Sequence, residues 1–244
     1  YKRQVHDILD IACGPGGWVL DVTFENPKIN VVGIDISRLM VEYARAQART
    51  QGLDNAHFRV MDALKPLDFP ENSFDFVNAR FLGGFMPKEA WAQLLQECVR
   101  ITHPGGIIRL TEWESPITNS AALEKLNAMG TRAMQLAERT FAPDGRHLGV
   151  TTMLGRFLRN AGCINVQAMA HVIDFSAGTE AYSGMYQDIM VVSKLIQPFL
   201  IKLGVTTQEE IDKLYEQVLA EMLSEDFCGV WFYLSVWGEA PLKG

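Results

Sequence analysis

Short apolar runs alternate with amphipathic stretches along the first half of the chain. Apolar runs of about four to eight residues bounded by turn residues are typical of buried strands, and apolar positions three and four apart are typical of helices. Strands are expected at 5–12, 30–36, 56–61, 73–79 and 107–113. Helices are expected at 17–25, 38–51 and 88–101. This alternation predicts a parallel sheet covered by helices on both faces.

The second half of the chain is less regular. Helices are expected at 120–139, 152–160, 182–197 and 207–224, and strands at 164–175 and 230–237. Thr207 and Glu210 have the spacing of a capping box at the start of the last helix. We therefore predict an α/β, Rossmann-like fold: a doubly wound, mostly parallel seven-stranded sheet with helical lid insertions. Ligands of such open sheets bind at the carboxyl ends of the strands.

Composition and charge narrow the classes of protein. The chain has 244 residues, 48% of them hydrophobic and 21% charged, which is a globular rather than a disordered balance. A formal net charge of -7 argues against a general nucleic-acid binder, because phosphates need a basic face. The apolar run at 189–205 contains Lys194, Pro198 and Lys202, so we expect no membrane span.

Four cysteines are spread along the chain without a CxxC pair or a metal-site spacing, so we expect no metal. They are Cys13, Cys98, Cys163 and Cys228. Free thiols suit a reducing compartment, which favours a cytoplasmic protein. The chain begins at Tyr1 rather than Met and reaches a strand almost at once, which is typical of a trimmed chain.

The most informative segment is ILDIACGPGGW, at 8–18. A strand that ends in a glycine-rich turn lets a ligand approach the backbone, and the helix that follows presents free N–H groups. Asp35 ends the next strand, where a carboxylate commonly binds ribose hydroxyls. A dinucleotide fingerprint would need a third glycine where Val19 stands, so an oxidoreductase is the weaker interpretation.

The segment LDIACGPGG resembles the first motif of class I S-adenosylmethionine-dependent methyltransferases, an acidic residue followed by a glycine-rich turn. Five further segments stand in that family's order: VVGIDIS, RVMDAL, FDFVNARF, ITHPGGIIRL and AGCINV. The resemblance covers residues 5 to about 175 and is strongest to the small-molecule group that includes quinone-biosynthesis and natural-product enzymes. Ala12 stands where many members have Gly, and it is small enough for the same close approach.

The resemblance implies S-adenosyl-L-methionine as cofactor and S-adenosyl-L-homocysteine as product. It places Asp10 and the glycine turn at the aminoacyl end, Asp35 at the ribose and Asp62 at the adenine amine. The full set that it implies is Asp10, Ala12, Cys13, Gly14, Pro15, Gly16, Trp18, Asp35, Ile36, Met40, Met61, Asp62, Ala63, Asn78, Ala79 and Arg80. The alternatives are a helix-capping role for Asp35, a turn role for Asp62 and a packing role for Cys13.

The same resemblance divides the chain into a core and helical additions. Residues 1–114 form the N-terminal part of the cofactor-binding core, and 149–175 its next helix and strand. Residues 115–148 form a helical insertion, 176–228 a lid insertion, and 229–244 the last strand and C-terminus. The additions carry methionines and aromatic residues that can line an apolar pocket. Packing of the lid helices on the sheet, or against a second subunit in a homodimer, is the equal alternative.

Methyl transfer needs proximity and a dry site more than a particular side chain. His147 and Glu114 are the candidate bases, against a surface role for His147 and a cap or solvated role for Glu114. The candidate substrate-binding residues are Phe81, Trp113, Tyr182, Met185 and Tyr186. We predict a methyltransferase for a small, largely apolar acceptor, with O-methylation favoured over C- or N-methylation.

Three alternatives to a small-molecule methyltransferase stay open. A methyltransferase acting on protein or RNA predicts a wide and partly basic cleft. A dinucleotide oxidoreductase predicts a nicotinamide cofactor. A non-catalytic module predicts cofactor binding without an acceptor cavity. Methylation of nucleic-acid bases is disfavoured, because the segment Asn78-Ala79-Arg80-Phe81 lacks the prolines that such enzymes usually carry after the fourth strand.

Overall fold

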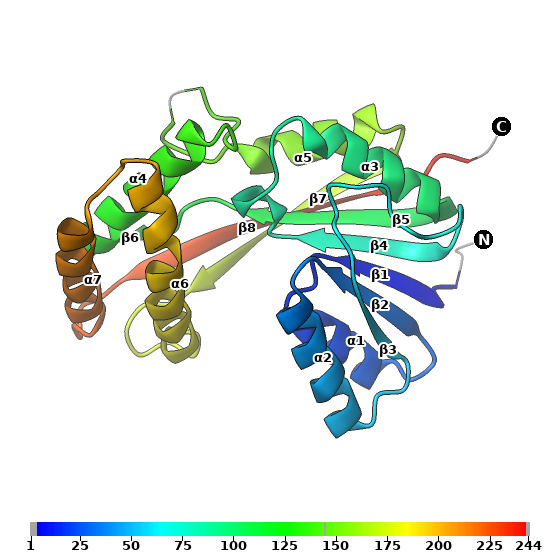
Figure 1. Ribbon diagram of the computed structural model, residues 1–244, viewed down its shortest axis with the longest axis horizontal. Coiled ribbons are helices and arrows are strands. Elements are labelled where there is room, and N and C mark those ends of the chain that lie inside the picture. Colours follow the sequence, from blue (N-terminus) through cyan, green and yellow to red (C-terminus); the bar gives the residue numbers. More distant parts are fainter. Residues whose placement is uncertain (1–3, 144, 243–244) are drawn as a thin grey trace.

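An eight-stranded sheet with helices on both faces forms the centre of the molecule (Figure 1). The computed structural model describes residues 4–143 and 145–242. The strands are β1 (Asp7–Ile11), β2 (Asn30–Asp35), β3 (Ala56–Val60), β4 (Phe74–Arg80), β5 (Thr102–Trp113), β6 (Ile117–Thr118), β7 (Ile164–Asp174) and β8 (Gly229–Glu239). The order β3-β2-β1-β4-β5 is parallel throughout, and β8 runs antiparallel to β5, β6 and β7. The predicted α/β class with a mostly parallel sheet is confirmed.

The helices follow the predicted order. They are α1 (Gly17–Glu25), α2 (Arg38–Gln51), α3 (Ala90–Ile101), α4 (Ala121–Leu136), α5 (Val150–Asn160), α6 (Tyr182–Lys202) and α7 (Gln208–Met222), with a 3-10 turn η1 at Leu82–Gly84. Helices α1 and α2 cover one face of the sheet, and α3 and α5 cover the other (Figure 1). Since the inner strands are covered on both faces, β1 is buried at every position after Asp7, and it includes one buried carboxylate, Asp10.

Several elements differ from the predicted ones. The turn at 103–106, expected to end a helix, instead bulges within β5: Phe74 pairs with Thr102, and Phe76 already with Ile107. Gly105 donates to Ala240 O there, and Ala240 donates to Gly106 O. Helix α6 continues through Pro198 to Lys202. The two-residue strand β6 and the turn η1 had no periodic signal, because both are too short to show one.

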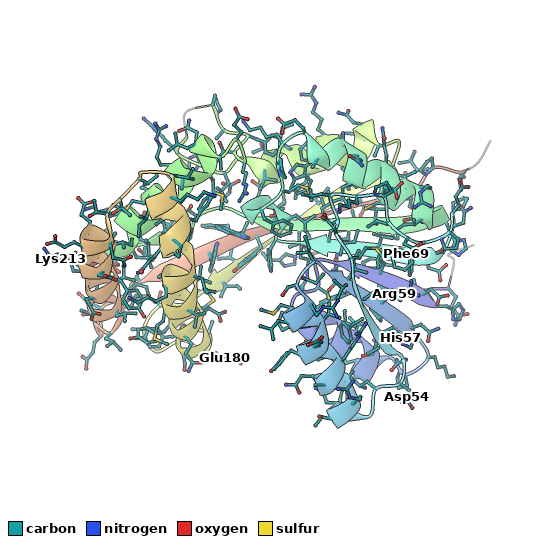
Figure 2. All side chains as sticks on the ribbon, in the orientation of Figure 1. Asp54, His57, Arg59, Phe69, Glu180 and Lys213 are labelled. Carbon is teal, nitrogen blue, oxygen red and sulfur yellow. The ribbon has the colours of Figure 1, made fainter. Side chains whose placement is uncertain are left out.

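Helices α4, α6 and α7 form a second lobe with its own apolar core, beside the sheet (Figure 1). Phe175 and Phe227 lie in that core, with ring centroids 5.7 Å apart. The predicted capping box is present, since Thr207 accepts from Glu210 N and the Glu210 side chain accepts from the Thr207 N–H. The polar face of α7 points away from the core, where exposed Lys213 lies (Figure 2) and pairs with Glu209 at 2.7 Å.

Strand β8 connects the two parts. Its residues 233–239 pair with 107–113 of β5 in the core sheet, whereas Val230 and Gly229 pair with Ile117 and Thr118 of β6 in the second lobe. Long strand β7 flanks β8 over most of its length. The two lobes are therefore joined by continuous backbone pairing rather than by a linker. No helix in the described part of the chain has both the length and the apolar character needed to cross a bilayer.

Substitutions at Gly229 of β8 and Gly184 of α6 test how tightly β8 packs where it joins the two lobes. A Cβ at Gly229 would lie 2.5 Å from Cζ of buried Phe175, whereas a Cβ at Gly184 of α6 meets nothing within 4 Å. We expect Gly229→Ala to lower the free energy of unfolding by roughly 1–3 kcal/mol. Gly184→Ala should raise it by about 0.5–1 kcal/mol through the unfolded chain's lost entropy. Urea unfolding measures both, and equal stability of Gly229→Ala and the wild type would contradict the packing described.

Candidate active site

The glycine-rich turn after β1 leaves an open surface. Ala12, Gly14 and Gly16 all have left-handed backbone angles, with φ of 56°, 55° and 86°. A Cβ at Gly14 or Gly17 would meet nothing within 4 Å, so the outer side of the turn is free for a ligand. A Cβ at Gly16 would lie 2.8 Å from the Ala44 Cβ, because α1 starts close against α2. Glycine is thus required at Gly16 for packing and at Gly14 for open access.

Asp35 lies beside this turn at the end of β2. Its Oδ2 accepts from Gly14 N at 2.9 Å, and its Oδ1 accepts from Ser37 N at 2.8 Å. Ser37, rather than Asp35, caps α2 by accepting from Met40 N. Each carboxylate oxygen keeps acceptor capacity, so the position is compatible with ribose hydroxyls. Ile36 and Met40, which follow Asp35, expose apolar side chains to 67% and 39%.

The third acidic residue, Asp62, stabilises the turn that follows it. Asp62 Oδ1 accepts from Leu64 N at 2.9 Å, a contact that fits the alternative turn role and leaves Oδ2 as a further acceptor. Met61, just before it, donates its backbone N–H to Asp35 O and therefore lies next to the ribose position. Half-buried Met61 and Ala63 pack against the main core. The structure thus brings the ends of β2 and β3 together beside the turn, as the resemblance implies.

Cys13 turns its side chain away from the open surface. A Cβ at Gly33 would lie 2.8 Å from Cys13 Sγ, which places the thiol against β2. Burial raises the pKa of Cys13 to about 12, and the Asp10 and Asp35 carboxylates add to this. The thiol is therefore protonated near neutral pH, and its surroundings favour the packing role.

A row of polar side chains crosses three strands beneath the turn. Asn78 Nδ2 donates to Asp10 Oδ1 at 2.7 Å, and Arg109 Nε donates to Asn78 Oδ1 at 2.8 Å. These residues are register neighbours on β1, β4 and β5. Burial raises the pKa of Asp10 to about 6, against the lowering effect of nearby Arg80. Asp10 is hence held within the sheet rather than on the open face of the turn.

Trp18 of α1 covers this row. The Arg109 guanidinium lies 5.3 Å from the Trp18 ring centroid and that of Arg80 lies 5.7 Å from it, both within cation–π range. Arg80 also lies 5.6 Å from the Phe81 ring centroid. The Nε of Arg80 is buried and has no hydrogen-bond partner among the described residues. Ala79, beside it, is buried in the main core.

Sequence reasoning assigned no role to Glu112, at the end of β5. Its carboxylate is 1% exposed and accepts from Leu82 N at 2.6 Å and Gly83 N at 3.2 Å. These bonds hold η1, directly after Phe81, whose φ of 61° is left-handed. Burial raises the pKa of Glu112 to about 8. A glutamate between Thr111 and Trp113, near the end of a strand expected in the core of the sheet, was the signal that could have indicated its role.

The two candidate bases lie away from a reacting position. Glu114 accepts from Leu148 N at 2.9 Å, Gly149 N at 3.0 Å and Thr151 Oγ1 at 2.7 Å, so it holds the start of α5. His147 is exposed in the preceding loop. Neither side chain is among the described residues that line the cavity. Their surroundings favour the cap role for Glu114 and the surface role for His147, and do not support a base.

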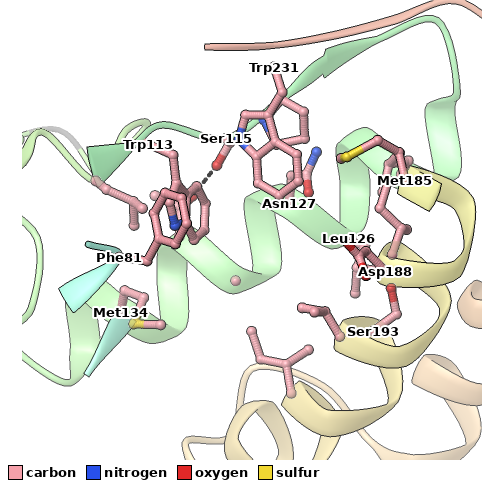
Figure 3. A pocket seen from close by; sticks show the side chains of 18 of the residues that line it. Phe81, Trp113, Ser115, Leu126, Asn127, Met134, Met185, Asp188, Ser193 and Trp231 are labelled. Carbon is pink, nitrogen blue, oxygen red and sulfur yellow. Dashed lines mark hydrogen bonds between the residues drawn. The ribbon is translucent and has the colours of Figure 1, made fainter. Parts of the chain in front are cut away.

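A cavity of about 660 Å³ lies between the turn, β8 and the second lobe. Phe81, Trp113 and Met185 line it, with Asn127, Asp188 and Ser193 also labelled in Figure 3. Pro15 of the glycine-rich turn is part of the same lining. The rest of the lining is Ser115, Pro116, Leu123, Leu126, Gly130, Thr131, Met134, Leu148, Ile189, Val192, Ile196, Trp231 and Tyr233. The turn and the cavity thus adjoin.

Two candidate substrate residues lie elsewhere. Tyr182 donates its hydroxyl to Met222 O at 2.7 Å and packs near Phe227 within the second lobe. Tyr186 packs beside Tyr182. Neither is among the described residues that line the cavity, whereas Trp231 and Tyr233 of β8 are. Helical spacing alone indicated the tyrosines, and the contribution of β8 depends on long-range pairing that the pattern did not show.

Comparison with known proteins agrees with this geometry. Residues 8–106 match the family model described as a methyltransferase domain. The chain is 31% identical over 111 residues to a demethylmenaquinone methyltransferase of Listeria welshimeri, a match that covers 45% of this chain and 46% of that protein. The chain therefore spans about half the length of the curated relatives it matches.

Two solved structures share the fold over nearly the whole chain. The YcgJ protein of Bacillus subtilis has a TM-score of 0.59 at 16% identity, covering 99% of this chain and 94% of that one. Phosphoethanolamine N-methyltransferase 2 of Haemonchus contortus, in complex with phosphomonomethylethanolamine and S-adenosylhomocysteine, has a TM-score of 0.56 at 17% identity, covering 99% and 50%. The Rossmann-like fold is confirmed, as is the resemblance of residues 8–106 to class I methyltransferases.

The two turn glycines give different expectations on substitution. Gly16 has a left-handed backbone, and a Cβ added there would lie only 2.8 Å from the Ala44 Cβ. Gly16→Ala should therefore lower the free energy of unfolding by about 3 kcal/mol or more. Gly14→Ala meets no atom, so only the backbone cost of roughly 1–2 kcal/mol is expected. Guanidinium unfolding measures both, and a Gly14→Ala variant that is less stable than Gly16→Ala would contradict the described packing.

Glu112 should make stability depend on pH. Its pKa is raised from 4.5 to about 8 in the folded protein, so the folded state binds more protons than the unfolded state between these values. The free energy of unfolding must therefore fall as pH rises through that window. Relative to wild type, Glu112→Gln should gain about 2 kcal/mol or more between pH 5 and pH 8. Urea unfolding at several pH values measures this difference.

Exposed Glu216 of α7 supplies the matched control for that measurement. Glu216→Gln should follow the wild-type pH profile, since its carboxylate is in water. Parallel profiles of Glu112→Gln and wild type would show that Glu112 does not titrate in this window.

Proposed function

We propose that this chain is an S-adenosylmethionine-dependent methyltransferase that acts on a small, largely apolar acceptor. One observation carries the proposal: Pro15 of the glycine-rich turn and Phe81, next to Arg80, both line the apolar cavity. A ligand bound on the glycine-rich turn would therefore have one end next to the cavity in which a second molecule, the acceptor, could bind. This is the arrangement that transfer between two bound molecules requires.

The residues beside the turn fit the cofactor. Asp35 would accept from the ribose hydroxyls, and the open turn at Gly14 would let the aminoacyl end approach the backbone. Ile36, Met40 and Met61 would pack on the adenine, with Asp62 and Ala63 at its polar edge. The buried and unpartnered Nε of Arg80 supplies a donor near the sulfonium end. When bound, the cofactor supplies an activated methyl group on sulfur.

The chain itself would orient the two reacting molecules and exclude water from them. Residues 115–148 and 176–228 would act as the lid, because α4 and α6 form one side of the cavity. Asp188 and Tyr233 are the titratable groups in the described lining. Burial and the Asp188 charge raise the pKa of Tyr233 to about 12, so its hydroxyl stays protonated near neutral pH. Reaction would thus rely on orientation and exclusion of water, with O-methylation favoured.

The chemistry of the lining favours an apolar acceptor over a phosphorylated one. Among the described lining residues there is no Lys, Arg or His to bind a phosphate. The curated relatives are named for demethylmenaquinone, and the Haemonchus structure holds phosphomonomethylethanolamine. The apolar lining suits an apolar acceptor of the demethylmenaquinone kind better than a phosphorylated one.

A protein or RNA acceptor finds less support. A shallow hollow of about 520 Å³ is lined by Arg45, Arg49, His57 and Arg59, beside Asp54 (His57, Arg59 and Asp54 are labelled in Figure 2). Arg49 lies in the last turn of α2, whereas the glycine-rich turn adjoins the start of that helix at Ser37. Arg49 is therefore at the opposite end of α2 from the proposed site, and none of these cations is among the described residues that line its cavity.

Location and assembly complete the proposal. Cys13, Cys98, Cys163 and Cys228 are free thiols, which supports a reducing, cytoplasmic compartment. Met169 and Val172, which are 54% and 58% exposed, lie on β7, whose outer edge pairs with no other strand among the described residues, and such an edge supports a homodimer contact.

Calorimetric titration with S-adenosylhomocysteine tests the cofactor site. We expect binding in the micromolar range, weakened at least tenfold, or by about 1.4 kcal/mol, in Asp35→Asn. Asp54→Asn, in the hollow beside β3, is the matched control and should bind as wild type does. No binding at high micromolar ligand would overturn the proposed function, and unchanged binding by Asp35→Asn would overturn the ribose contact.

A further inference from the structure

A buried polar group of the apolar cavity's lining has no hydrogen-bond partner among the described residues. Asn127 lines the cavity from α4, and its Nδ2 is buried with no hydrogen-bond partner among the described residues. A buried N–H group without an acceptor is costly, so such groups are normally paired. A rotation of the Asn127 side chain into the adjoining cavity would bring this group to an oxygen supplied by a ligand.

The position of Asn127 in α4 is where an apolar residue is expected. Leu123, Thr131 and Met134 line the cavity from the same helix face, four residues before Asn127 and four and seven residues after it. An asparagine in that stripe interrupts its apolar pattern. Ser115 and Thr131, two other polar residues of the lining, hydrogen bond to each other at 3.3 Å. The amide nitrogen of Asn127 is thus a buried donor of this lining that has no partner among the described residues.

The charge of the lining restricts what can bind. Asp188 of α6 is its one charged residue among those described, and it lies at an exposed position (Figure 3). Its effect reaches across the cavity, because the Asp188 carboxylate contributes to the raised pKa of Tyr233 on β8. A ligand with a carboxylate or phosphate would meet this charge without a compensating cation. An uncharged ligand would not.

We infer that the acceptor is an uncharged, largely apolar molecule carrying an oxygen that accepts a hydrogen bond from Asn127 Nδ2. The inference rests on the proposed function, since it names the acceptor class of that same cavity. It assigns Asn127 as a specificity-determining residue. It also assigns Asp188 the exclusion of anionic analogues. A ketone, a quinone-type carbonyl or an ether oxygen has the required chemistry.

Four naphthalene probes with the same ring system test this inference. They are naphthalene, 2-acetylnaphthalene, 2-naphthol and 2-naphthoate, titrated by calorimetry with and without saturating S-adenosylhomocysteine. Wild type should bind 2-acetylnaphthalene about tenfold tighter than naphthalene, the gain expected from one bond to a buried unpaired donor. It should bind 2-naphthoate more weakly than the ketone, and Asp188→Asn should reduce that difference.

Two variants at Asn127 separate recognition from folding. Asn127→Leu should reduce the preference for the ketone over naphthalene to about twofold or less, while naphthalene binds at least as well as before. Asn127→Asp keeps the size but removes the donor, so it should prefer 2-naphthol, which can donate, over the ketone. Gln187→Leu, the same kind of change at an exposed position of α6, should behave as wild type.

The outcomes distinguish the inference from the proposed function. An unchanged ketone preference in Asn127→Leu, or no ketone binding by wild type, would overturn the role of Asn127. Absence of S-adenosylhomocysteine binding would overturn the methyltransferase proposal, and the titrations without cofactor would still decide the role of Asn127.

Discussion

The arrangement of the site depends on the backbone pairing of β8 on both of its edges. Residues 233–239 complete the core sheet against β5, and β7 flanks the same strand on its other side. Gly229 and Val230 pair with β6 in the second lobe. Side chains alternate between the two faces of a strand, so Trp231 and Tyr233 of β8 point to the same face, and both line the cavity. The lid helices are thereby positioned by hydrogen bonds of the main sheet.

Beside the proposed site, buried polar groups hold the strand ends and the η1 turn in one conformation each. The row Asp10, Asn78 and Arg109 is satisfied across three strands, and Trp18 covers it. Glu112 holds the backbone of η1 in the same way. Burying a carboxylate costs free energy, as the raised pKa values of Asp10 and Glu112 show. In return, each of these groups fixes one conformation of a segment next to the proposed cofactor.

Local pattern was sufficient for much of the fold. The turn at 12–16, the Ser37 cap and the capping box of α7 depend on residues within a few positions of each other, so the sequence predicted them. Register across strands is not local. The Asp10–Asn78 bond joins residues 68 positions apart, and Glu114 reaches the start of α5 from 34 or more positions away. For the same reason, periodicity placed Tyr182 in the pocket, although its hydroxyl is bound to Met222 O.

The central claim is that one ligand on the glycine-rich turn faces a second compartment for the acceptor. A crystal structure of the protein with S-adenosylhomocysteine tests it most directly. The account predicts the ribose at Asp35 and the sulfur at the wall formed by Pro15 and Phe81, directed into the cavity. A ligand bound elsewhere, or one whose sulfur points away from that cavity, would contradict it.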